Sequence, residues 1–113
     1  MKSPITTHVL DVSLGKPAVN VTVRLARQDG AAFVELASGV TDADGRVTTL
    51  LAPGALTRGI YRLSFDVGAY FAASQRSTFY PSVDVVFVVD HPEQHHHVPL
   101  LLSPFGYSTY RGS

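Results

Sequence analysis

The sequence predicts an all-β fold, a sandwich of short strands in a single domain that spans residues 1–113. Apolar and polar residues alternate along several segments, and a period of two residues is typical of strands with one buried face. Valine, threonine, tyrosine and phenylalanine, which favour strands, are plentiful. Turn signals rich in glycine, proline and aspartate separate these segments at LGKPA (14–18), RQDG (27–30), DADG (42–45) and APG (52–54). Short strands between such turns indicate a sandwich.

Four strands are predicted in the first half of the chain, near 5–12, 19–27, 32–39 and 46–51. In the second of these, Val21, Val23 and Leu25 alternate with polar residues. The turn signals separate the strands from one another. The DADG segment is a strong hairpin-turn signal, so the fourth predicted strand begins at Arg46.

The second half of the chain predicts one short helix and four more strands, near 60–67, 83–90, 95–103 and 105–111. Tyr61, Leu63 and Phe65 alternate with polar residues in the first of these strands. Residues 66–76 break the alternation with alanine, serine and glutamine, which are tolerated in a helix, and predict the one short helix. No repeat or linker interrupts the chain, so no second domain is expected.

The predicted strand at 83–90 is apolar on both faces. Val83, Val85, Phe87 and Val89 supply one face, and valines at 86 and 88 make the opposite face apolar as well. An antiparallel strand with one face in water should alternate more cleanly. Either a neighbouring loop covers the second face, or another subunit does; the sequence favours the subunit.

Composition excludes several classes of partner. Nine basic and nine acidic residues cancel, which argues against binding to nucleic acid or to an anionic membrane surface. There is no cysteine, so disulfide and thiol chemistry are excluded. No apolar run approaches the roughly 20 residues of a membrane helix. The first residues lack the apolar stretch of a signal peptide, so we expect a cytoplasmic protein, or a periplasmic one if a precursor was processed.

Histidine and arginine are the candidate functional residues. On a strand, His95 and His97 share one face and His96 lies on the other, and with His8 this pair could form an open zinc site. The alternative is that His95 and His96, like the histidine at 91, are exposed or structural. His97 directly precedes the apolar VPLLL segment, where partial burial can shift the pKa of an imidazole toward a useful value.

The turn at 42–45 projects Arg46 from the start of a strand in fixed geometry, although an arginine there is ordinarily a solvated surface residue. The LGKPA segment is a turn and not a phosphate loop, because the other required residues are missing. No nucleophile signature is present. If the protein is an enzyme, the residues favour activation of water by histidine, with arginine stabilising charge.

The C-terminal residues are polar and follow the apolar run, which suggests an end that is used. In YSTYRGS, alternation places Tyr107, Thr109 and Arg111 on one face and Ser108 and Tyr110 on the other. A strand could therefore deliver Tyr110 to a cleft while its neighbours pack elsewhere.

Three blocks carry a resemblance to a known family: THVLD with GKPA, then TDADGR, then HHHVPLLLSPFGYSTYRGS. They resemble the 5-hydroxyisourate hydrolases, the transthyretin-related proteins, from end to end. The terminal Tyr-Arg-Gly-Ser distinguishes these enzymes from transthyretin, the hormone carrier of the same fold. The resemblance implies a transthyretin-like sandwich of two four-stranded sheets.

The resemblance also implies an activity: opening of the ring of 5-hydroxyisourate, an unstable product of urate oxidation, to 2-oxo-4-hydroxy-4-carboxy-5-ureidoimidazoline. It implies a homotetramer, a dimer of dimers with the active sites at the dimer–dimer interface, and no metal or organic cofactor. The site residues that it implies are, for catalysis, His8, Arg46, His97 and Ser113, and, for substrate binding, His8, Arg46, Tyr110 and Arg111. The family commonly has tyrosine where this chain has His96. A non-catalytic carrier of small aromatic ligands is the alternative.

Overall fold

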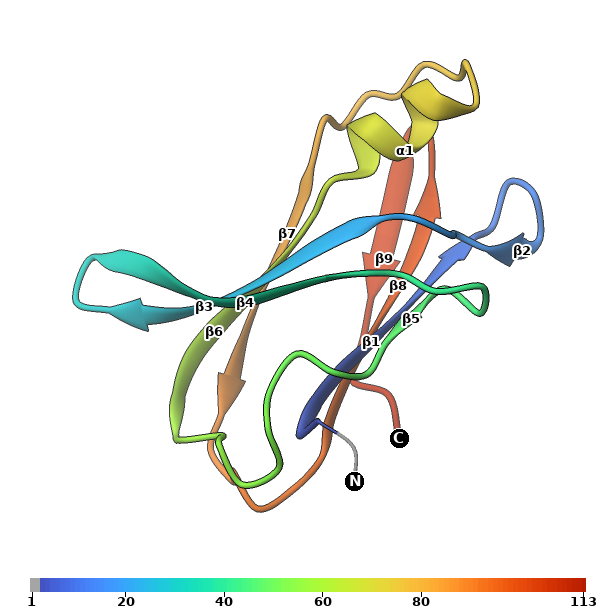
Figure 1. Ribbon diagram of the computed structural model, residues 1–113. Coiled ribbons are helices and arrows are strands. Elements are labelled where there is room, and N and C mark those ends of the chain that lie inside the picture. Colours follow the sequence, from blue (N-terminus) through green and yellow to red (C-terminus); the bar gives the residue numbers. More distant parts are fainter. Residues whose placement is uncertain (1–2) are drawn as a thin grey trace.

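Two β-sheets pack face to face in the computed structural model, which describes residues 3–113 (Figure 1). The elements are β1 (Ile5–Asp11), β2 (Lys16–Pro17), β3 (Thr22–Asp29), β4 (Ala32–Val40), β5 (Arg46–Val47), β6 (Gly59–Phe65), α1 (Val67–Ala73), β7 (Val83–Val89), β8 (His96–Ser103) and β9 (Gly106–Thr109). The predicted all-β sandwich with one short helix is therefore confirmed.

Strand order differs between the two sheets. One sheet has four strands in the order β4-β3-β6-β7, all antiparallel. The other has the order β2-β1-β8-β9, and β5 adds a fifth strand by pairing with β1. β1 and β8 are parallel, with Thr6 opposite His97 and His8 opposite Pro99. The five-stranded sheet is thus built around the pairing of an early strand with a late one.

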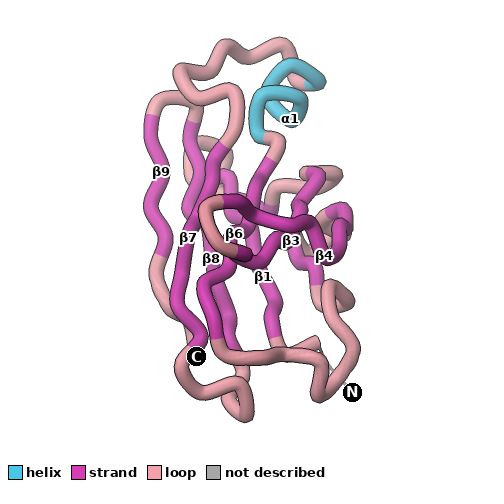
Figure 2. The backbone as a smooth tube through the Cα atoms, turned by 90° about the vertical axis from the view of Figure 1, so that its left-hand side faces the viewer, coloured by secondary structure: helices cyan, strands magenta, loops and turns pink. Residues whose placement is uncertain are grey.

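The core lies between the sheets and follows the predicted alternation. In β6, Tyr61, Leu63 and Phe65 are buried, and β8 contributes Leu100 and Leu102 from the opposite sheet. Helix α1 closes one end of the sandwich, while both ends of the described chain lie at the other end (Figure 2). Within residues 3–113, no helix is long and apolar enough to cross a membrane.

Several strands begin or end at other residues than predicted, and two of these differences have a clear cause. The strand predicted at 46–51 pairs with β1 only at β5, because the residues that follow form hydrogen bonds with Ser3 instead. The Ser3 amide donates to the Thr48 carbonyl, and the Ser3 hydroxyl accepts from the Leu51 amide. The strand predicted at 19–27 begins at Thr22, because Asn20 has a φ of 65°. Asparagine tolerates this left-handed conformation, which interrupts an extended strand.

The strand with two apolar faces is β7, at the edge of the four-stranded sheet. Its inward residues Val83 and Val89 are buried in the core, as predicted. On its other face, Val86 and Val88 are 56% and 59% exposed. No loop within residues 3–113 covers these two valines, so the loop interpretation is not supported.

A buried carboxylate joins β1 to the helix end of the sandwich. Asp11 is fully buried and accepts hydrogen bonds from Tyr70 at 2.7 Å and from Arg76 at 2.8 Å. It also accepts from the backbone and hydroxyl of Ser13. Although burial alone would raise the pKa of Asp11, the hydrogen bonds from Arg76, Ser13 and Tyr70 lower it to about 2. Folding therefore favours the charged carboxylate.

We predict that Asp11→Asn lowers the free energy of unfolding at pH 7 by about 2–4 kcal/mol, because Arg76 then loses its charged partner. The folded pKa of Asp11 is depressed, so its contribution is full above the ordinary value near 4 and is lost as the pH falls toward 2. Urea unfolding at pH 7 and pH 3 measures both effects. Asp84→Asn, on the exposed face of β7, is the control; equal stability of the two variants at pH 7 would contradict the prediction.

Candidate active site

The predicted histidines and arginine meet on the face of the five-stranded sheet that points away from the core. In the pairing of β1 with β5, His8 lies opposite Arg46, and residues opposite each other in register project from the same face. In the pairing of β1 with β8, His97 lies opposite Thr6, two residues from His8. Three strands that are distant in sequence therefore bring His8, Arg46 and His97 together.

The DADG turn fixes the position of Arg46. A carboxylate oxygen of Asp42 accepts hydrogen bonds from the backbone amides of Asp44 and Arg46, at 2.9 and 3.0 Å. Gly45 has a φ of 74°, and a Cβ there would lie 2.5 Å from the carbonyl oxygen of Val9. Only glycine allows this approach to β1. The predicted turn thus places Arg46 beside the strand that carries His8.

The consecutive histidines at the start of β8 divide between the two faces of the sheet, as predicted. His95 and His97 share the outer face, with ring centroids 6.4 Å apart. The Thr6 hydroxyl lies 2.8 Å from His95 Nε2 and 2.8 Å from His97 Nδ1. His96 faces the other way and is buried, with Nδ1 3.0 Å from the Gln94 carbonyl oxygen. Because His96 faces away from the outer face, having histidine there instead of the family's usual tyrosine does not change which side chains lie on that face.

Burial and positive charge lower the pKa of both site histidines. For His97, burial is the largest cause and the charge of Arg46 is the next. For His8, burial again comes first and Arg46 second, although hydrogen bonding and charge at Asp44 act in the opposite direction. A lowered pKa keeps an imidazole neutral at neutral pH. Each of these histidines is thus available to accept a proton.

The C-terminal residues return to β8 beside His97. The Gly112 amide donates to the His97 carbonyl at 2.8 Å, and these residues form an isolated antiparallel bridge. A Cβ at Gly112 would lie 2.6 Å from His97 Cδ2, so the glycine permits this close approach. Ser113 then reaches the pocket that contains His97. The tail therefore lies directly against β8.

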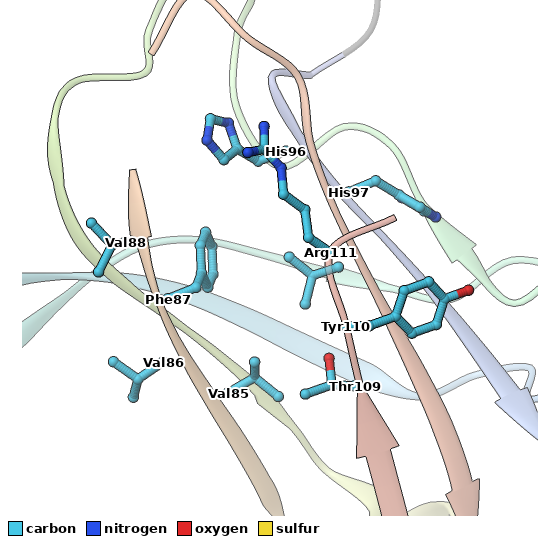
Figure 3. Close-up of a pocket in the computed structure, with 10 residues that line it drawn as sticks. Val85, Val86, Phe87, Val88, His96, His97, Thr109, Tyr110 and Arg111 are labelled. Carbon is cyan, nitrogen blue, oxygen red and sulfur yellow. The ribbon is translucent and has the colours of Figure 1, made fainter. Parts of the chain in front are cut away.

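Tyr110 and Arg111 project from opposite faces of the sheet, as alternation predicted. Figure 3 shows Tyr110 and His97 extending to one side, whereas Arg111 extends toward His96 on the other. The Arg111 guanidinium donates to the Gln94 side chain at 3.1 Å and to the His95 carbonyl at 3.3 Å. Arg111 lines a groove between β7 and β9 to which His97 and Tyr110 also contribute. It does not line the outer-face pocket in which His97 lies with Arg46 and Ser113.

A pocket of about 330 Å³ lies over the outer face of the sheet. It is lined by Thr6, Thr7, Arg46, Thr48, His95, His97 and Ser113. His8 is not among the lining residues but neighbours Arg46 through strand pairing. Within residues 3–113, no three histidine, cysteine, aspartate or glutamate side chains are grouped so that they could hold a metal ion.

The predicted site did not include His95 or the threonines that line the pocket. His95 was interpreted either as a zinc ligand or as an exposed or structural residue; it is exposed, lines the pocket and contacts Thr6. Thr6 was not considered at all. Alternation along β1 places Thr6 on the same face as His8, and this was the available signal. The contact of Thr6 with His97 depends on which strands pair, which the sequence pattern does not reveal.

The two-sheet sandwich and the histidine–arginine cluster on the outer face of one sheet together define a transthyretin-like protein with a polar surface pocket. A family model described as HIUase/Transthyretin family matches residues 5–112. The chain belongs to this family, and the resemblance in its sequence is confirmed.

Three similar proteins match along nearly their whole length. The 5-hydroxyisourate hydrolase of Caulobacter vibrioides is 51% identical over 115 residues, with 98% of this chain and 99% of that protein covered. The structure of Klebsiella pneumoniae 5-hydroxyisourate hydrolase aligns with a TM-score of 0.85 at 39% identity, covering 96% of this chain and 97% of that one. Sea bream transthyretin, solved in complex with thyroxine, gives a TM-score of 0.91 at 34% identity, covering 97% and 95% of the two chains.

Proposed function

We propose that this chain is a hydrolase that opens the ring of 5-hydroxyisourate to 2-oxo-4-hydroxy-4-carboxy-5-ureidoimidazoline, a step in urate degradation. The observation that carries the proposal is the meeting of His97 and Arg46 at one polar pocket, with His8 paired to Arg46, in a chain 51% identical to a 5-hydroxyisourate hydrolase. The site residues and the sequence similarity both indicate the same chemistry, the hydrolysis of a cyclic amide. That reaction needs an activated water and a group that stabilises the charge on the carbonyl.

His97 is the residue that we assign as the general base. It lines the pocket, and its lowered pKa leaves it neutral and able to take a proton from water. His8 lies opposite Arg46 in the pairing of β1 with β5. We assign it to orienting the substrate or the water. A histidine base acts in its neutral form, so activity is expected to be retained below the ordinary imidazole pKa of 6.5 before it falls in acid.

Arg46 is assigned to hold and polarise the oxygens of the substrate. Its guanidinium presents several donors in a planar fork that suits carbonyl and oxyanion groups, and it remains charged throughout catalysis. Tyr110 and Ser113 come from the tail and lie on the same side of the sheet as His97. Their hydroxyl groups are assigned to hydrogen-bond the substrate ring or the attacking water. Arg111 points away, so we assign it to anchoring the tail rather than to binding substrate.

A carrier of small aromatic ligands is the second candidate function, because sea bream transthyretin, with a TM-score of 0.91, was solved with thyroxine. Polar side chains dominate the pocket of this chain: three threonines, two histidines, an arginine and a serine. Pockets for apolar ligands are mostly hydrophobic and aromatic. The polar lining favours the hydrolase.

The direct test generates 5-hydroxyisourate in a cuvette from urate and urate oxidase and follows the decay of its absorbance. We expect the protein to accelerate this decay over the spontaneous rate, and to do so equally after exhaustive treatment with EDTA. Metal independence is expected because the site lacks a set of three metal-binding side chains within residues 3–113. Decay at the spontaneous rate would refute the hydrolase proposal, and loss of activity with EDTA would refute the metal-free mechanism.

We further propose that the protein assembles as a homotetramer, a dimer of dimers with the active sites at the dimer–dimer interface. Two features support this. Val86 and Val88 leave an apolar strip exposed on β7, and exposed apolar surface of this kind favours burial against a partner. The pocket of His97 and Arg46 is open on the face of a sheet, where a second subunit could close it.

Sedimentation equilibrium should therefore give a mass of about four times 12.2 kDa. Val88→Lys adds a charge to the exposed strip and is expected to weaken assembly, because burying an unpaired charge is unfavourable. Val40→Lys, at another exposed valine on β4, is the matched control. A fully active monomer would contradict both the tetramer and the shared active site.

A further inference from the structure

Thr6 contacts two histidines at once through a single oxygen atom. Its hydroxyl lies 2.8 Å from His97 Nδ1 and 2.8 Å from His95 Nε2. The Thr6 side chain is almost fully buried, whereas His95 is exposed and His97 is half-buried. The three residues therefore form a hydrogen-bonded chain along the wall of the pocket.

A hydroxyl group has one proton, which limits how this chain can be arranged. Thr6 can donate to only one of the two ring nitrogens, so it must accept from the other. With both histidines neutral, one arrangement places a proton on His97 Nδ1 and leaves His97 Nε2 free. The reverse arrangement places the proton on His95 Nε2 and leaves His97 with its proton on Nε2. The direction of the Thr6 hydroxyl thus decides which nitrogen of His97 can act as a base.

Two observations favour the first arrangement. Arg46 lines the same pocket as His97 and brings a positive charge near it, and a nearby cation that can only donate favours a lone pair over an N–H on the ring nitrogen that Thr6 does not contact. His95 is at the surface, where water can satisfy whichever of its nitrogens Thr6 does not contact. His95 can therefore carry its proton on Nδ1, with water as the partner there, and accept the Thr6 proton at Nε2.

We propose that Thr6 is a positioning residue that fixes the tautomer of His97, with the proton on Nδ1 and Nε2 free toward the pocket, and that His95 holds the Thr6 hydroxyl in the required direction. The catalytic consequence of this assignment rests on the proposed hydrolase function, in which His97 takes a proton from water. The tautomer itself belongs to the resting protein and does not depend on any substrate.

Nuclear magnetic resonance tests the tautomer without substrate. Long-range ¹H–¹⁵N correlation spectra of protein labelled with ¹⁵N-histidine distinguish protonated from unprotonated ring nitrogens, and His97→Gln identifies the signals of His97. We expect unprotonated Nε2 at His97 in the wild type and in Thr6→Ser. Thr6→Val keeps the shape of the side chain but removes its hydroxyl, and is expected to give a mixture of tautomers. Wild-type protein with the proton on Nε2 would overturn the proposal whether or not any variant folds.

Kinetics on 5-hydroxyisourate tests the consequence. Thr6→Val is expected to lower kcat by about 10–10²-fold with little change in KM, the scale of losing one buried hydrogen bond at a catalytic group. Thr6→Ser should restore kcat to within about threefold, and His95→Ala should cause a smaller loss than Thr6→Val.

Thr78→Val is the matched control, because the Thr78 hydroxyl also lies within hydrogen-bonding distance of several groups, the Pro104 and Tyr80 carbonyls and the Tyr80 amide, but contacts no histidine. It should leave both the tautomer and kcat unchanged. If Thr6→Val alters only the tautomer or only kcat, Thr6 does not act through His97 and the proposal fails. If the wild type proves inactive on 5-hydroxyisourate, the proposed function fails, while the spectra still decide the tautomer.

Discussion

Replacing His97 or Arg46 by alanine is expected to lower kcat/KM for 5-hydroxyisourate by about 10²–10⁴-fold, the usual effect of removing a catalytic base or a charge-stabilising donor. His8→Ala should also be strongly impaired, because His8 pairs with Arg46 across β1 and β5. All three side chains lie on the outer face of the sheet, so their removal leaves the core intact. Thermal unfolding should therefore be nearly unchanged while the rate of absorbance decay collapses toward the spontaneous rate.

The matched control is His91→Ala. His91 is exposed and lies near Glu93 in the loop before β8, outside the pocket. Its replacement should leave turnover within about twofold of the wild type, since surface substitutions away from a site change little. A loss at His91 equal to that at His97 would show that the site has been placed wrongly.

Deleting residues 110–113 is expected to reduce turnover at least about 10²-fold while the protein still folds, the scale of losing positioned catalytic hydrogen bonds. The deletion removes Tyr110 and Ser113 from the pocket side of the sheet, together with the Gly112 contact to His97. Tyr110 is 57% exposed, so little apolar contact is lost. Circular dichroism checks the fold, and the 5-hydroxyisourate assay checks the rate.

Single substitutions separate the parts of the tail. Tyr110→Phe removes one hydroxyl and should raise KM without altering stability. Arg111→Ala should act less strongly, because Arg111 contacts Gln94 and the His95 carbonyl on the other side of the sheet. Near-normal turnover after the four-residue deletion would mean that the tail only completes the last strand.

Local patterns predicted most of the fold because each depends on residues close in sequence. Alternation identified the buried face of β6, and the aspartate–glycine turn before Arg46 was readable from four letters. The same alternation separated Tyr110 from Arg111, and the structure places them on opposite sides of the sheet. The family resemblance implied Arg111 as a substrate-binding residue, whereas in the structure it contacts Gln94 and the His95 carbonyl and does not line the pocket of Arg46 and Ser113.

Long-range pairing is what the sequence pattern could not reveal. No residue near Thr6 or His97 in the sequence indicates that β1 lies parallel to β8. The contact between the Thr6 hydroxyl and His97 therefore could not be predicted. The sequence pattern also could not predict that the strand beginning at Arg46 ends at Val47. There, the hydroxyl of Ser3 replaces one of the expected strand-to-strand hydrogen bonds. Such contacts depend on tertiary packing, which overrides the preference of a short segment.

The pairing of β1 with β8 also constrains the order in which the molecule can be made. Ile5 pairs with His96, and Asp11 with Leu102, so β1 has no β8 partner until residues 96–102 have left the ribosome. Pairings between such distant segments close a long loop and slow folding relative to local hairpins. The four-stranded sheet contains the β3–β4 hairpin and can begin to form earlier during synthesis, whereas Thr6 and His97 cannot meet until β8 has been made. Catalytic competence should therefore be among the last properties that the newly made chain acquires.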